Sequence, residues 1–82
     1  VDLVGGARQP SEHLSDAEID RIVRAAVDEL PEDQRIAFVL REYQDLDYRE
    51  IAQIMECSEG TVKSRLHRAR EALRQRLRRL KV

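Results

Sequence analysis

Basic side chains that could neutralise phosphate groups are concentrated at the carboxyl end of this chain. Residues 61–82 hold nine of the 15 Lys and Arg residues and a single acid, whereas residues 1–60 hold six basic and 15 acidic side chains. The two parts therefore carry about +8 and −9, which the net charge of −1 conceals. A strongly basic segment joined to an acidic body is typical of proteins that bind a nucleic-acid backbone.

Within this basic segment, the apolar spacing predicts which side chains would face a ligand. Val62, Leu66 and Ala69 fall on one face of a helix, in which successive residues are rotated by about 100°. On the other side, small residues would let the helix approach the major groove, and Lys and Arg could donate to guanine acceptors or phosphates. The residues at these positions are Gly60, Thr61, Lys63, Ser64, Arg65, His67 and Arg68.

Further basic residues lie too far along the same helix to contact the same few bases. We expect them to follow the phosphates or to contact another acidic surface. These residues are Arg70, Arg74, Arg76, Arg78, Arg79 and Lys81.

Other kinds of chemistry have little support in this sequence. The single cysteine, Cys57, and the two histidines, His13 and His67, are not at the spacing of a zinc site. The acidic residues fall at helix starts and on polar faces, and no glycine-rich phosphate loop or nucleophile motif is present. We therefore expect no metal, no cofactor and no enzymatic activity, and we expect Cys57 to fill a turn rather than to sense redox state.

The elements that must position the basic side chains are predicted to be helices. Residues 1–14 show no regular pattern and are predicted to be a flexible linker. The Ser-Asp-Ala-Glu sequence that begins at Ser15 is a capping box and predicts a helix over about residues 15–30. Pro31 separates this helix from a second one over about residues 32–43, because proline suits a first helical turn.

Two further helices follow. Asp47 and Glu50 form a second capping box, which opens a helix of about nine residues. Ser58 is a good N-cap for a final helix over about residues 59–79. The apolar stripe from Val62 to Leu80 predicts that this helix packs inward along its whole length.

A short helix, a tight turn and a long basic helix together predict a helix-turn-helix. The fold class is therefore all-α, a small four-helix domain over residues 15–82 without winged elements. The longest apolar run, residues 36–40, is far shorter than the roughly 20 residues of a membrane span, and the lone cysteine fits the cytoplasm. We expect a monomer, although the leucine stripe could also form a coiled-coil dimer seam. The initial Val indicates a fragment of a longer protein.

Four motifs occur in a specific order and spacing. They are LPEDQR at residues 30–35, LRE at 40–42, YREIAQIM at 48–55 and GTVKSRLHRAR at 60–70. Together they resemble region 4 of bacterial sigma factors, and most closely the extracytoplasmic-function group of the sigma-70 family. The resemblance covers about residues 15–80. It implies that the last helix recognises the promoter −35 element, that other surfaces hold the β flap of RNA polymerase, and that an anti-sigma factor regulates the intact protein.

The resemblance also assigns roles to individual positions. It implies that Arg35, Tyr48 and Arg49 contact the DNA backbone. The residues that it implies for recognition of DNA by the last helix are Thr61, Lys63, Ser64, Arg65, His67 and Arg68.

This chain departs from the family pattern at two turns. The family often has Gly where Asp45 and Glu56 stand, and the turn at Glu56 is a candidate for a positive φ. A residue with a Cβ in that conformation costs on the order of 1 kcal/mol, which a folded domain tolerates. Asp47 stands where Ser or Thr is common and caps a helix equally well.

Two other classes of protein share parts of the pattern. The DNA-binding output domain of a response regulator has similar Glu-Ile-Ala and Thr-Val-Lys elements, but usually lacks the motifs at residues 30–31 and 64–70. A protein-interaction module would use the amphipathic helices to bind an inhibitory partner such as an anti-sigma factor.

Overall fold

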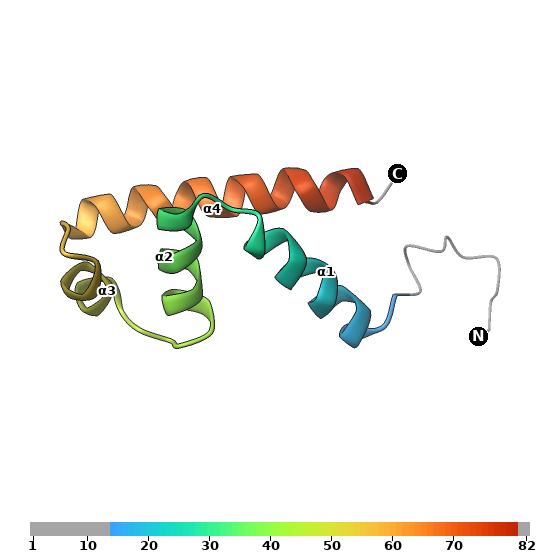
Figure 1. Cartoon of the computed structure of the whole chain (residues 1–82), viewed down its shortest axis with the longest axis horizontal. Coiled ribbons are helices and arrows are strands. Elements are labelled where there is room, and N and C mark those ends of the chain that lie inside the picture. Colours follow the sequence, from blue (N-terminus) through green and yellow to red (C-terminus); the bar gives the residue numbers. More distant parts are fainter. Residues whose placement is uncertain (1–13, 81–82) are drawn as a thin grey trace.

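The structure, a computed structural model that describes residues 14–80, consists of helices and turns, with no strand among these residues. The all-α prediction is confirmed. In Figure 1 the long helix α4 runs the length of the molecule, and the three shorter helices lie along one side of it. The helices are α1 (Asp16–Asp28), α2 (Glu32–Glu42), α3 (Tyr48–Met55) and α4 (Glu59–Leu80). The predicted linker, residues 1–14, falls almost entirely outside the described residues.

Both predicted capping boxes are present. The Ser15 hydroxyl accepts a hydrogen bond from the Glu18 backbone N–H at 3.1 Å, and the Glu18 carboxylate accepts from the Ser15 N–H at 2.8 Å. Asp47 and Glu50 make the same reciprocal pair at 2.8 and 2.9 Å. The bond from the Ser15 backbone, with a smaller contribution from its hydroxyl, lowers the pKa of Glu18 below its ordinary value of 4.5. Local sequence therefore determines where α1 and α3 begin.

Helix α1 ends earlier than the predicted residue 30. Its last residue is Asp28. As the chain leaves the helix, the Glu29 N–H donates to the Ala26 carbonyl at 3.1 Å and the Leu30 N–H donates to the Val27 carbonyl at 3.0 Å. A residue that precedes proline is sterically hindered from helical geometry, so Pro31 stops the helix upstream rather than at its own position. Leu30 is nevertheless buried, because the turn directs it into the core.

Two residues adopt the left-handed backbone conformation. Asp45 has φ 58° and Glu56 has φ 55°, and Glu56 is the C-cap of α3. The suspected positive φ at Glu56 is therefore confirmed, and Asp45, the other turn position at which the sequence resemblance pointed to Gly, adopts the same conformation. Each turn carries a small strain that glycine would relieve.

The core forms two adjoining clusters along α4. Phe38 of α2 packs against both of them, and this links the two ends of the molecule. The cluster toward the carboxyl end consists of Ala26, Val27, Leu30, Ala69 and Leu73. The cluster beneath the start of α4 consists of Ala37, Ile51, Ala52, Val62 and Leu66.

The prediction that α4 packs inward along its whole length is wrong beyond Leu73. Leu77 is only half-buried, and the side chain of Leu80 lies outside the described part of the structure. Figure 1 gives the reason, because the beginning of α1 diverges from α4 and leaves the last turns of α4 without a neighbouring helix. Leu66 and Leu73 are buried within the monomer at 0% and 7% exposure, so neither is available for a coiled-coil seam.

Candidate nucleic-acid interface

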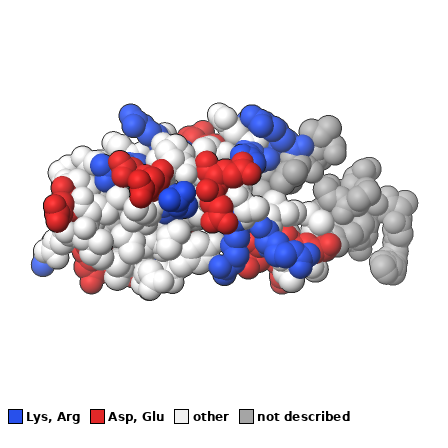
Figure 2. Space-filling view, in the orientation of Figure 1, with Lys and Arg blue, Asp and Glu red and all other residues white. Residues whose placement is uncertain are grey.

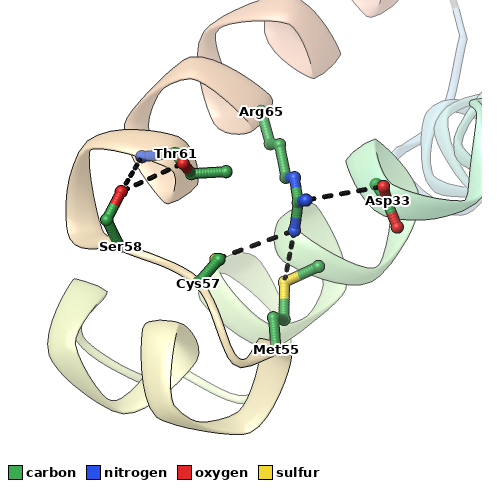
Figure 3. Close-up of polar contacts among 6 residues, drawn as sticks. All are labelled: Asp33, Met55, Cys57, Ser58, Thr61 and Arg65. Carbon is green, nitrogen blue, oxygen red and sulfur yellow. Dashed lines mark hydrogen bonds and ion pairs between the residues drawn. The ribbon is translucent and has the colours of Figure 1, made fainter.

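Helix α3, the turn at residues 56–58 and the start of α4 form the predicted helix-turn-helix. The Ser58 hydroxyl accepts a hydrogen bond from the Thr61 backbone N–H at 3.0 Å, and the hydroxyl oxygens of the two residues are also 3.0 Å apart. Figure 3 shows this cap at the beginning of α4. The predicted capping role of Ser58 is confirmed, and its partner is Thr61.

The first turns of α4 have one buried and one exposed side. Val62 and Leu66 are fully buried, with exposed fractions of 0%, and they anchor the helix on α2 and α3. Four of the residues expected to recognise DNA lie on the exposed side. They are Lys63, Ser64, His67 and Arg68. The expected orientation of Ser64 and Arg68 toward solvent is confirmed.

Gly60 lies exposed in the first turn of α4. A Cβ atom added there would lie 3.8 Å from the Ser58 Oγ atom, which is an ordinary contact, so the fold itself does not require glycine. Glycine nevertheless keeps this turn free of a side chain and allows a bound molecule to approach the backbone closely.

Arg65 differs from the other candidates because its guanidinium group contacts other parts of the chain. Its Nη1 atom lies 3.7 Å from the Cys57 Sγ atom and 3.9 Å from the Met55 Sδ atom, and its Nη2 atom lies 3.5 Å from the Asp33 Oδ2 atom. Figure 3 shows the side chain pointing into the space between α4, the start of α2 and the end of α3. The Arg65 side chain is 24% exposed.

The start of α2 borders the exposed side of α4. A surface hollow of about 460 Å³ lies between the two helices. The N-cap of α2, Pro31, has no side chain that could bond to the first amides of the helix. The hollow is lined by Pro31, Asp33, Gln34, Thr61, Ser64, Arg65 and Arg68.

The three residues expected to contact the DNA backbone lie in different surroundings. Arg35 is half-buried, and its guanidinium lies 3.5 Å from the carbonyl oxygens of Asp28 and Leu30 at the turn between α1 and α2. Tyr48 is half-buried beside another guanidinium. Arg49 is exposed and borders a second hollow of about 460 Å³ beside the helix-turn-helix turn.

Sequence reasoning missed the role of Arg41. Its guanidinium donates a 2.9 Å hydrogen bond to the Leu46 carbonyl and lies 5.6 Å from the centre of the Tyr48 ring. These two contacts hold the connection between α2 and α3 in place. The LRE motif marked the position, but only the folded connection identifies its partners.

Three of the basic residues farther along α4 pair with acids of the same chain. Arg70 lies 3.1 Å from Glu42 of α2, and the hydrogen bond between these two side chains raises the pKa of Arg70. Arg76 pairs with Glu29 at the end of α1, and Arg74 pairs within α4. Figure 2 accordingly shows acidic and basic side chains next to one another on the face in view. The acidic surface that we expected for these arginines is partly the body of the chain itself.

Within residues 14–80, no three His, Cys, Asp or Glu side chains lie close enough together to hold a metal ion. None of the described helices is both long and apolar enough to cross a membrane.

Comparisons with known proteins agree with the geometry. The sigma-70 region 4 family matches residues 20–73. The ECF RNA polymerase sigma-E factor of Haemophilus influenzae is 43% identical over 68 residues, which are 83% of this chain and 36% of that protein. The factors of the same name from Escherichia coli K12 and Salmonella typhimurium LT2 are 48% identical over 64 residues, 78% of this chain and 34% of each relative.

This chain therefore spans about a third of the length of the curated relatives that it matches. The matched family and these relatives are of the same family that the four sequence motifs resemble. The alternative of a response-regulator output domain is therefore set aside. The chain belongs to region 4 of the sigma-70 family, of the extracytoplasmic-function type.

Proposed function

We propose that residues 15–82 are the promoter-recognition domain of an extracytoplasmic-function sigma factor. The domain binds the −35 element in the major groove through the first turns of α4 and so directs RNA polymerase to a subset of promoters. It acts by binding and catalyses no reaction. One observation carries the proposal: Val62 and Leu66 bury one side of α4, while polar and basic side chains occupy the other side.

The exposed side of α4 has the chemistry that base recognition needs. Lys63 and Arg68 can donate to guanine acceptors, Ser64 can donate or accept, and His67 can stack on or donate to a base. Thr61 and Gly60 belong to the turn that first meets the groove. The exposed amide end of α4 also favours a phosphate nearby.

Contacts to the DNA backbone fix the register of such a domain without reading sequence. Arg49 has the best placement of the three backbone candidates, since it is exposed beside the turn that precedes α4. Arg35 and Tyr48 remain candidates, but each already contacts another part of the chain. Arg78 and Arg79 are exposed and make no ion pair with another described residue, so they are available for phosphates.

The protein partners are proposed to bind away from the DNA-binding side. A hollow of about 370 Å³ between α1 and the end of α2 is lined in part by Val27, Val39 and the exposed Tyr43. We propose that RNA polymerase, through its β flap, and an anti-sigma factor contact this region, and that the protein acts as a monomer in the cytoplasm. The substitution Tyr43→Asp is expected to weaken binding to core polymerase and to leave affinity for duplex DNA unchanged. An unchanged affinity for polymerase would exclude this surface.

The test of base recognition compares two arginines of the same helix. Arg68 and Arg78 are both exposed, and they lie about 15 Å apart along α4. The probe is a duplex that the wild-type chain selects from a randomised library, and the reference is a random duplex of the same length. Arg68→Ala should weaken binding to the selected duplex by about 1–3 kcal/mol and barely change binding to the random duplex. Arg78→Ala should weaken binding to both duplexes by the same amount. Equal losses with Arg68→Ala would reject base recognition by this residue.

A further inference from the structure

Arg65 lies in the most conspicuous polar cluster beside the proposed DNA-binding side. Its guanidinium group is shared between three segments: the start of α2, the end of α3 and the turn before α4. Contacts to all three segments tie the first turns of α4 to α2 and α3. The side chain is directed into the space between them rather than outward (Figure 3).

We propose that Arg65 is a positioning residue, which holds α4 at the angle needed for base recognition and does not itself contact a base. The inference rests on the proposed function. It revises the expectation, drawn from the family resemblance, that Arg65 belongs to the DNA-recognising group. The bases would be recognised by Lys63, Ser64, His67 and Arg68 instead.

The chemistry of arginine suits this role. A guanidinium group is planar and has several N–H donors in a fixed arrangement, so it can contact a carboxylate on one side and sulfur atoms on another. Lysine has a single ammonium group and cannot span Asp33, Met55 and Cys57 in the same way. If Arg65 turned outward to a base, these contacts would be lost.

The position of Asp33 supports the same conclusion. Its side chain is 67% exposed and lines the hollow that also contains Ser64 and Arg68. A carboxylate there would repel an approaching phosphate unless a nearby positive charge compensates for it. Pairing with Arg65 provides that charge and at the same time ties the first turn of α2 to α4.

The sign of the effect of Asp33→Asn distinguishes positioning from base contact. If Arg65 positions α4, Asp33→Asn should lower affinity for the selected duplex about fivefold or more, which is the lower end of the effect of losing one base contact. Affinity for a random duplex should stay the same or rise, because a negative charge is removed. If Arg65 contacts a base, releasing it from Asp33 should leave affinity for the selected duplex unchanged or raise it, and this result would overturn the inference.

Glu32→Gln is the matched control. Glu32 is the exposed acid next to Asp33 in the first turn of α2, and it makes no ion pair with Arg65. The two substitutions remove the same charge from the same turn. Glu32→Gln should therefore leave the ratio of selected to random affinity at the wild-type value, and an equal fall in this ratio for both variants would overturn the role of the Asp33 contact.

Substitutions of Arg65 itself provide an independent readout. Arg65→Lys and Arg65→Met should lower the ratio of affinity for the selected duplex to affinity for the random duplex by similar factors, and the slope of log affinity against log salt should keep its wild-type value. A phosphate contact would instead be rescued by lysine, and its loss in the methionine variant would reduce the slope by about one. If Arg65 contacted a base, its substitution would relax the preference at one base pair only. If Arg65 positions α4, its substitution should tilt the helix and weaken the preferences at several base pairs. Either of these alternative patterns would overturn the inference.

Loss of folding alone can be separated from both roles. A smaller folded fraction lowers affinity for the two duplexes by the same factor, so it leaves their ratio unchanged. All variants are compared at a temperature at which circular dichroism shows them fully folded. If the wild-type chain fails to distinguish the selected duplex from the random one, the proposed function falls and this inference falls with it. If the wild type distinguishes them, the behaviour of the Arg65 and Asp33 variants decides the inference by itself.

Discussion

The left-handed conformation of Glu56 predicts that glycine is more stabilising than alanine at this position, whereas alanine is more stabilising than glycine elsewhere in the same helix. Glu56 has φ 55° and ψ 51° at the C-cap of α3, and its side chain is exposed. Gln53, three residues earlier, is exposed within the right-handed part of the same helix. The perturbation is to place Gly and Ala in turn at each of these two positions.

The expected magnitudes follow from the backbone. A residue with a Cβ atom in the left-handed region costs about 1–2 kcal/mol, and glycine loses about 0.5–1 kcal/mol more conformational entropy on folding than alanine. At Glu56 the relief of strain exceeds the loss of entropy, so Glu56→Gly should be about 0.5–1 kcal/mol more stable than Glu56→Ala. At Gln53 only the loss of entropy operates, so Gln53→Gly should be about 0.5–1 kcal/mol less stable than Gln53→Ala.

The assay is urea unfolding of the four variants, followed by circular dichroism at 222 nm, a wavelength that reports helix content, and analysed with a common m-value. In a thermal scan, the difference at Glu56 should move the midpoint by roughly 2–8 °C in a domain of this size. Comparing Gly with Ala at one position cancels the loss of the Glu56 carboxylate. If Glu56→Ala proved as stable as Glu56→Gly, the reasoning from left-handed strain would be refuted.

Three further predictions concern the core, the first cap and the groove-facing turn. Leu66 is fully buried, so Leu66→Ala should lower the free energy of unfolding by about 3–5 kcal/mol, measured by urea unfolding; a loss below about 1 kcal/mol would contradict its place in the core. The pKa of Glu18 is lowered in the folded state, so its contribution to the stability of α1 should be present above pH 4.5 and be lost as the pH falls through the lowered value. Amide exchange in α1, measured as a function of pH, should report this loss. Glu18→Gln should abolish the part of the pH dependence that comes from this group. If the pH dependence of exchange were the same in the variant and the wild type, the capping assignment would be contradicted. Gly60→Ala should raise the stability of α4 by about 0.5–1 kcal/mol, because alanine loses less conformational entropy on folding and its Cβ would make only an ordinary contact. The same substitution should weaken binding to the selected duplex, and equal or tighter binding would show that DNA does not approach this turn closely.

Much of the fold could be predicted from local signals. The capping boxes at Ser15 and Asp47 depend on residues three positions apart, and the periodicity of α4 predicted which of its residues are buried as far as Leu73. The helix ends were less predictable. Pro31 acts on its preceding neighbours, and this shortened α1 by about two residues relative to the expectation.

The candidate site could be predicted only in part. The exposed positions of Ser64 and Arg68 follow from helical spacing once the buried face is known. The partners of the charged residues do not follow, because Arg65 meets Asp33 and Arg76 meets Glu29 across wide separations in the chain. Every arginine of the basic segment looks equally available for phosphate in the sequence alone.

Local chemistry, namely caps, prolines and helical periodicity, established the four helices, the helix-turn-helix and the direction in which the first turns of α4 face, since each of these depends on neighbours within about four residues. Tertiary packing established which charges remain available to a partner. An ion pair such as Arg70 with Glu42 exists only after two helices have docked and brought the groups within about 4 Å. Exposed charges that lie more than about 8–10 Å apart are largely screened from one another. The opposite net charges of residues 1–60 and 61–82 indicated a nucleic-acid ligand. The contacts in the folded protein separate the cations that can meet this ligand from those that pair with acids of the same chain.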